Sequence, residues 1–211
     1  MNVLVAGSHG QVGQHVTASL ANSDHDVRGM VRKESQASDI ESIGAEPVVA
    51  DLTGDVSHAV EGVDAVIFAA GSGGEDVWGV DRDGAIGLVD EAESRSVDRF
   101  VLLSSINADQ PENSPEALRE YLRAKGEADE YLRESDLTYT IVRPGPLTDE
   151  DGTGRIKTGR NLDRDGVDIP REDVARTLVA ALGEAETHET TFELAAGDDQ
   201  IEEALRSPVE N

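Results

Sequence analysis

Short apolar segments alternate with amphipathic stretches along the chain. The apolar segments are rich in Val, Ile and Leu and are bounded by turn residues, a pattern that predicts β-strands. They cover residues 2–6, 26–31, 48–49, 65–69, 99–103 and 138–142. Helical spacing of apolar residues predicts helices over residues 11–21, 56–60 and 81–94, and a further helix that opens at Ser114-Pro115-Glu116. Strands separated by helices form βαβ units, so the pattern predicts an α/β fold with a doubly wound parallel sheet.

Local signals mark where two of these elements begin and end. The Ser114 hydroxyl is expected to cap its helix, with Pro115 at the first helical position. Arg143-Pro144-Gly145 is expected to stop the strand before it. The remaining chain is less regular, and we predict a loop over 149–159, a helix over 171–182, a strand over 191–194 and a short helix over 201–205. No repeat or linker interrupts residues 1–211, which predicts a single domain with a small C-terminal appendage.

The charge of the chain narrows the choice of partners. It has 44 acidic and 18 basic residues and a formal net charge of −26, which argues against nucleic acid as a partner. No apolar run is long enough to span a membrane, and no secretion signal precedes the first strand, so a cytoplasmic location is expected. The chain has no cysteine, and its five histidines are scattered, so we expect no metal site.

The basic residues are unevenly divided, with 15 arginines and only 3 lysines. An acidic, lysine-poor composition resembles that of cytoplasmic proteins from extreme halophiles. Molar salt shortens the Debye length to about 3 Å and screens the self-repulsion of such a chain. A merely acidic protein from an ordinary habitat is the alternative.

A glycine-rich segment directly follows the first strand and opens the first helix. It reads Gly7-Ser8-His9-Gly10-Gln11-Val12-Gly13. Glycines let the backbone turn sharply and approach a pyrophosphate, and the helix N-terminus offers free N–H groups. The segment therefore predicts a dinucleotide site on a Rossmann-type sheet, with a plain glycine-rich turn as the alternative. His9 would either donate to the pyrophosphate or lie at an exposed loop tip.

The ends of the next strands bear on the choice of cofactor. Val31 is followed by Arg32-Lys33, and cations at this position suit a 2′-phosphate, which favours NADP(H) over NAD(H). A solvated surface pair is the alternative. Asp51-Leu52 could contact the adenine or simply cap a strand end, and the small residues Ala69-Ala70-Gly71 leave room for a ribose.

Candidate catalytic residues follow the fifth strand. Ser104-Ser105 ends that strand, and Tyr121 and Lys125 are four residues apart on the next helix, so they share one helical face. An ammonium group lowers the pKa of a neighbouring phenol, which suits a proton-transfer role. A half-buried Tyr beside an exposed Lys is the alternative. Trp78 lies in a predicted loop, where it would wall a pocket or anchor the following helix.

These residues resemble the short-chain dehydrogenase/reductase superfamily, in particular its atypical, NmrA-like NAD(P)-binding branch. Members of this branch are often labelled sugar epimerases or likened to biliverdin reductase B. The features that carry the resemblance are the glycine segment, Asp51-Leu52, Ser104-Ser105, the Tyr121/Lys125 pair and the run YTIVRPGPLT at residues 139–148. In the superfamily the tyrosine exchanges the proton, the lysine holds the nicotinamide ribose and the serine binds the reacting oxygen. The resemblance assigns these roles to Tyr121, Lys125 and Ser105, with Ser104 as the substitute, and places Pro144-Gly145 beside the nicotinamide.

The implied activity is hydride transfer between NADP(H) and a small carbonyl or hydroxyl compound, a quinone or a flavin-like acceptor. Residues 147–211 would complete the sheet and form a small lobe on the substrate side, in a monomer or a homodimer. A nucleotide-sugar epimerase or dehydratase is a weaker alternative, because a second nucleotide needs more chain than the 65 residues after Pro146. A non-catalytic, NADP(H)-sensing regulator is the alternative of a different class.

Overall fold

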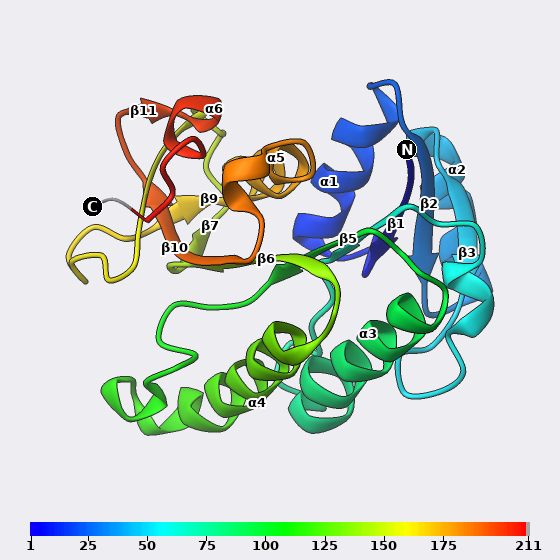
Figure 1. The fold of residues 1–211 in the computed structure, drawn as a ribbon, viewed down its shortest axis with the longest axis horizontal. Coiled ribbons are helices and arrows are strands. Elements are labelled where there is room, and N and C mark those ends of the chain that lie inside the picture. The colour runs from blue at the N-terminus through cyan, green and yellow to red at the C-terminus, as the bar shows by residue number, and fades with distance from the viewer. Residues whose placement is uncertain (210–211) are drawn as a thin grey trace.

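The fold is built on a nine-stranded sheet with the strand order β11-β8-β10-β6-β5-β4-β1-β2-β3 (Figure 1). The structure is a computed structural model that describes residues 1–209. The strands of this sheet are β1 (Asn2–Ala6), β2 (Asp26–Val31), β3 (Glu46–Val49), β4 (Ala65–Phe68), β5 (Arg99–Leu103), β6 (Thr138–Pro144), β8 (Arg155–Gly159), β10 (Thr190–Ala196) and β11 (Asp199–Gln200). A separate pair joins β7 (Leu147–Thr148) to β9 (Ile169–Pro170).

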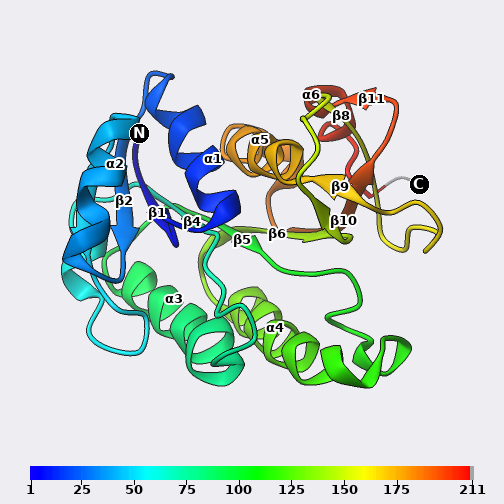
Figure 2. The ribbon, with the colours of Figure 1, turned by 180° about the vertical axis from the view of Figure 1, so that it is seen from behind.

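The helices cover both faces of the sheet (Figures 1 and 2). They are α1 (Gln11–Ala21), α2 (Ala37–Ile43), α3 (Gly84–Ser94), α4 (Glu116–Glu134), α5 (Arg171–Ala181) and α6 (Ile201–Ala204). A π-helix, η3 (Val77–Asp83), leads into α3, and short 3-10 helices are η1 (Glu34–Gln36), η2 (Ser57–Val60), η4 (Pro111–Asn113) and η5 (Ala185–Thr187). Over residues 1–209, no helix combines the length and apolar character that crossing a bilayer requires.

The predicted fold class is confirmed. Strands β1 to β6 and β10 are parallel, and the order 3-2-1-4-5-6 is that of the Rossmann fold. Within residues 1–209, only β8 and β11 at the far edge add antiparallel pairs. The carboxyl ends of β1 and β4 are therefore neighbours, and ligands of such sheets bind beyond the carboxyl ends of the strands.

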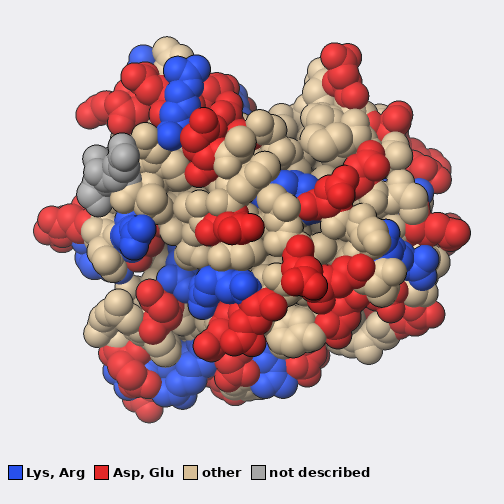
Figure 3. Space-filling model, viewed as in Figure 1, with Lys and Arg blue, Asp and Glu red and all other residues tan. Residues whose placement is uncertain are grey.

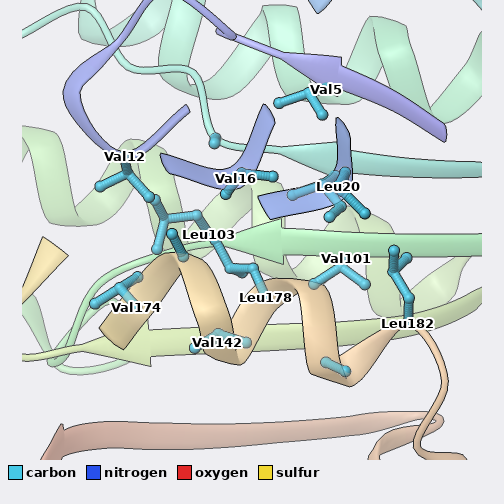
Figure 4. Packing of buried hydrophobic residues seen from close by; sticks show 14 of the residues in the cluster. Val5, Val12, Val16, Leu20, Val101, Leu103, Val142, Val174, Leu178 and Leu182 are labelled. Carbon is cyan, nitrogen blue, oxygen red and sulfur yellow. The ribbon is translucent and has the colours of Figure 1, made fainter. Parts of the chain in front are cut away.

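Two apolar cores lie on opposite faces of the sheet. Alternate residues of a strand point to opposite faces, so Val5 of β1 packs with α1 and α5, whereas Leu4 packs with α3 and α4. Figure 4 shows Val16 and Leu20 of α1 and Leu178 of α5 gathered over the strands. Apolar side chains on both faces hold the sheet rigid, which fixes the positions of the loops at its carboxyl edge.

Most predicted elements are present within two residues of their expected bounds, and β1, α1, β2 and β5 match throughout. The loop predicted over 149–159 is wrong in its second half, which forms β8. In that strand Ile156 and Thr158 are buried, and β10 supplies the antiparallel partner. Helix α2 went unpredicted.

Three predicted boundaries are also wrong. The helix predicted over 81–94 begins at Gly84, after the π-helix. Strand β6 continues through Arg143 and Pro144, because buried carboxylate contacts accommodate the charge of Arg143 inside the sheet. Ser114 does not cap α4, since Pro115 occupies the N-cap and the Ser114 Oγ accepts a hydrogen bond from Asn107.

Candidate functional site

The glycine loop lies between the carboxyl ends of β1 and β4. Gly7 has a φ of 82°, in the left-handed region that favours glycine. A Cβ atom on Gly7 would lie 2.5 Å from the Cα of Ala70, so the loop is in direct backbone contact with the end of β4. Beside it, a Cβ on Gly71 would lie 3.2 Å from a carboxylate oxygen of Asp81. The small residues at these two strand ends let the segments meet.

The start of α1 is packed onto the same loop. A Cβ on Gly13 would lie 2.0 Å from the Gly7 carbonyl oxygen, a distance that no side chain allows. Gly10 occupies the N-cap and no side chain caps the helix. Within residues 1–209, the backbone N–H groups of Gln11 and Val12 have no backbone acceptor. This cradle of glycines with free N–H donors fits a diphosphate.

The two residues between the first glycines hold the loop in place. Ser8 is buried, its N–H donates to the Met30 carbonyl at 3.1 Å, and its Oγ lies 2.5 Å from the Thr17 Oγ1. The His9 ring nitrogens lie 3.0 Å from an Asp39 carboxylate oxygen and 3.1 Å from the Gln36 Nε2. His9 thus ties the loop to η1 and α2.

Arg32 and Lys33 follow β2 and are exposed. The Arg32 side chain makes no hydrogen bond or ion pair to the residues that the structure describes. Asp51 accepts hydrogen bonds from the Thr53 N–H at 3.0 Å and Oγ1 at 2.8 Å. These bonds, and to a smaller extent the charge of Arg32, hold the pKa of Asp51 below its usual value. Asp51 therefore caps the turn after β3, and Leu52 packs against the first residue of α3.

Lys125 is buried beneath the ends of the central strands. Its Nζ donates to the Leu103 carbonyl at 3.1 Å, immediately before Ser104-Ser105. The same ammonium lies 6.0 Å from the centre of the Tyr121 ring and 5.7 Å from that of Phe68. The structure thus brings together the Tyr/Lys pair of α4 and the end of β5. Lys125 is not the exposed lysine of the alternative interpretation.

Asp81 is a site residue that sequence reasoning missed. Its carboxylate is fully buried, with Oδ1 3.6 Å from the Lys125 Nζ and Oδ2 accepting from the Ser72 N–H at 3.1 Å and Oγ at 2.6 Å. A buried ammonium requires a nearby anion, and Asp81 supplies it. The carboxylate comes from the π-helix, whose register no periodicity in the sequence reveals.

The two serines after β5 differ in their surroundings. Ser104 is buried, and its hydroxyl is close enough to the Asp129 carboxylate to lower the pKa of that group, against the larger effect of burial. Ser105 is half-buried, and its Oγ donates to the Ile106 carbonyl at 3.4 Å, a weak bond that an incoming acceptor can replace. Ser105 is therefore the better placed of the two to meet a ligand.

The turn after β6 is fixed by charge pairs and close packing. The Arg143 Nε donates to the fully buried Asp129 carboxylate at 2.9 Å, and an Arg143 terminal nitrogen lies 3.0 Å from Asp109. Burial raises the pKa of Asp129, against the opposing effect of the Arg143 charge. Pro144 is buried, and a Cβ on Gly145 would lie 1.9 Å from the Val167 carbonyl oxygen, so no side chain fits there.

Trp78 anchors the π-helix to α4. Its Nε1–H donates to the Glu120 carboxylate at 2.7 Å, and the Arg82 guanidinium lies 4.7 Å from the ring centre. Glu120 precedes Tyr121, so this contact holds the π-helix beside the candidate catalytic face of α4.

Comparisons with known proteins agree with this geometry. A family model described as NAD(P)H-binding matches residues 7–185. YhfK of Bacillus subtilis, named an uncharacterized sugar epimerase, is 42% identical over 98% of this chain and 99% of its own length. A solved structure from Bacillus halodurans, whose name places it among NAD-dependent epimerases/dehydratases, is 39% identical with a TM-score of 0.93. The match covers 97% of this chain and 98% of that chain.

A second solved structure, the oxidoreductase ylbE from Lactococcus lactis, is 33% identical with a TM-score of 0.90. It covers 100% of this chain and 98% of its own. The family model spans most of the residues that build the carboxyl edge described above, from the glycine loop through Tyr121 and Lys125 to Gly145. The chain belongs to the NAD(P)H-binding family.

Proposed function

We propose that the chain is an NADP(H)-dependent oxidoreductase of the atypical short-chain dehydrogenase/reductase branch. Its substrate would be a small carbonyl or hydroxyl compound, a quinone or a flavin-like acceptor. One observation carries the proposal. The buried Lys125 ammonium joins Tyr121, Asp81 and the end of β5 at the same sheet edge as the glycine loop.

The residues at this edge would have separate roles in cofactor binding and in proton transfer. The bound cofactor would supply or accept the hydride. The glycine loop and the start of α1 would hold its diphosphate, and Lys125 its nicotinamide ribose. The Tyr121 hydroxyl would exchange a proton with the reacting oxygen, which Ser105 would orient. Pro144-Gly145 would lie against the nicotinamide.

The preference for NADP(H) over NAD(H) is part of the proposal. Its support is the exposed Arg32 guanidinium, which is free of hydrogen bonds within residues 1–209 and follows β2. In Rossmann folds an arginine in this region accommodates a 2′-phosphate, whereas an acidic residue binds the ribose hydroxyls. Lys33 adds a second exposed cation beside it.

Epimerase activity is a second candidate, favoured by the names of YhfK and the Bacillus halodurans protein. Much of the chain after Pro146 lies in β8, α5, β10 and β11. Those elements complete the sheet and cover it, which reduces the chain available to enclose a second nucleotide. The remaining turns would form the small lobe on the substrate side.

Steady-state oxidation of NADPH with a panel of carbonyls, quinones and flavins tests the proposal. Tyr121→Phe removes the proton donor and is expected to lower kcat about 100-fold or more, with little change in NADPH affinity. Tyr131→Phe is the matched control. Tyr131 is an exposed tyrosine of the same helix whose hydroxyl contacts Asp90, and its loss is expected to leave kcat unchanged.

Full turnover by Tyr121→Phe would contradict the assigned role. NADPH binding without oxidation by any member of the panel would favour the regulator. Conversion of a nucleotide sugar with no net consumption of the cofactor would favour the epimerase.

A further inference from the structure

A groove of about 520 Å³ lies between α4 and the outer strands β6 and β10. Tyr139 and Arg143 of β6, with Thr191 and Glu193 of β10, contribute to its lining. The β6 pair is four residues apart and the β10 pair two, so the members of each pair face the same side of the sheet. The groove extends from Asp109, in the loop after β5, to the beginning of β10. Most of it therefore lies away from the carboxyl edge of the sheet, where the dinucleotide is proposed to bind.

Three arginines line this groove. Arg143 is buried and already neutralised by Asp129 and Asp109. Arg133, near the end of α4, and Arg160, after β8, are exposed and form neither a hydrogen bond nor an ion pair with any residue from 1 to 209. Figure 3 shows basic side chains gathered between α4 and the strands above it.

Free arginines are uncommon in this molecule, because the 44 acidic residues provide carboxylates almost everywhere. Within the described part of the chain, the arginines that donate hydrogen bonds or form ion pairs are Arg28, Arg82, Arg95, Arg99, Arg119, Arg123, Arg143, Arg155, Arg164, Arg171 and Arg176. Those without such a contact are Arg32, Arg133, Arg160 and Arg206. Two of these four line one groove.

Two of the groove's carboxylates are already occupied. Glu193 is buried and accepts two hydrogen bonds from Arg164, at 2.7 and 2.9 Å, and one from the Leu162 N–H at 2.6 Å. Asp109 is paired with Arg143. Glu189, immediately before β10, is the lining carboxylate left to oppose an anion. A further polar atom, the buried Thr191 Oγ1, has no hydrogen-bond partner within residues 1–209.

We propose that this groove binds a small oxyanion ligand, a carboxylate or phosphate compound, through Arg133 and Arg160. Guanidinium groups bind such anions by charge-assisted, often bidentate hydrogen bonds. The Thr191 hydroxyl supplies a neutral donor from the groove lining. The ligand is separate from the dinucleotide, whose diphosphate cradle lies at the carboxyl ends of β1 and β4.

Calorimetric titration with two probes, citrate and inorganic phosphate, tests this site in the absence of any cofactor. The wild-type chain is expected to bind at least one probe saturably, and the tighter probe identifies the class of anion. Arg133→Gln and Arg160→Gln are each expected to weaken binding about tenfold, and the double variant about a hundredfold. Arg206→Gln, which removes a free arginine outside the groove, is the matched control and keeps wild-type affinity.

Arg133 and Arg160 make no hydrogen bond or ion pair with residues 1–209, and Arg133 affects the buried Asp129 through its charge, less than Arg143 does, so the variants are expected to melt close to the wild-type temperature. No binding of either probe to the wild type would overturn the proposal. So would unchanged binding by the folded double variant, or an equal loss in Arg206→Gln. NADPH affinity, measured on the same variants, is expected to stay unchanged, which separates this site from the proposed oxidoreductase function.

Discussion

At the scale of single residues, cofactor choice depends on the free guanidinium at the end of β2. Arg32 makes no hydrogen bond or ion pair within residues 1–209, and its charge attracts Asp51, which Thr53 already satisfies by hydrogen bonds. An exposed guanidinium that makes no hydrogen bond has none to break when it turns towards a ligand. Arg32 is therefore available to a 2′-phosphate.

Arg32→Ala is expected to raise the Kd for NADPH about tenfold or more, because a charge-assisted hydrogen bond to the phosphate is lost. The Kd for NADH is expected to change by less than about twofold, because NADH has no such phosphate. Titrations of both coenzymes measure this. Arg206→Ala, which removes an exposed arginine elsewhere, controls for net charge. Equal losses for both coenzymes would refute the role of Arg32.

Sequence reasoning identified the residues whose roles follow from local spacing. Gly7 and Gly13 were predicted because a strand and a helix flank them, and the structure shows that both positions exclude a Cβ. The pairing of Tyr121 with Lys125 follows from four-residue spacing. Asp81 could not be predicted, since its contact with Lys125 depends on a π-helix and on packing between segments distant in sequence.

At the scale of elements, two helical glycines have opposite surroundings. Gly13 in α1 is pressed against the Gly7 carbonyl, whereas a Cβ on Gly87 in α3 would meet no atom within 4 Å. Helix α1 therefore needs glycine in order to reach the loop, and α3 does not.

Gly13→Ala is expected to lower the free energy of unfolding by about 1–3 kcal/mol through overpacking, and to weaken NADPH binding by displacing the start of α1. Gly87→Ala, the matched control, is expected to raise the free energy of unfolding by about 0.5–1 kcal/mol, because alanine favours helix. Urea denaturation of both variants provides the comparison. A stable Gly13→Ala variant with wild-type NADPH affinity would contradict the packing argument.

Elements with strong apolar periodicity were predictable, and those stabilised by distant partners were not. β1 and β5 were placed to the residue because their apolar runs are continuous. β8 was missed because a short edge strand depends on its antiparallel partner β10. The end of β6 was missed because an arginine in a sequence is expected to be solvated. The buried ion pair of Arg143 with Asp129 depends on the fold.

At the scale of the whole molecule, the net charge of −26 opposes compaction. Acidic side chains cover much of the face in Figure 3. An ion pair such as Arg82 with Glu127 offsets the repulsion only in its own surroundings, and exposed pairs contribute little to the stability of the fold. We propose that this surface suits a solution rich in salt.

The melting temperature is expected to rise by several degrees between about 0.1 M and about 2 M potassium chloride, since salt screens the repulsion among carboxylates. Thermal melts followed by circular dichroism measure this change. A melting temperature independent of salt would contradict the proposed adaptation.

The central claim is that a nicotinamide dinucleotide binds across the carboxyl edge of the sheet, with its diphosphate on the glycine loop. Calorimetric titration of the folded wild-type chain with NADPH, in concentrated potassium chloride, tests it most directly. We predict saturable binding of one NADPH per chain. Absence of binding by both NADPH and NADH, in protein shown to be folded, would contradict the claim.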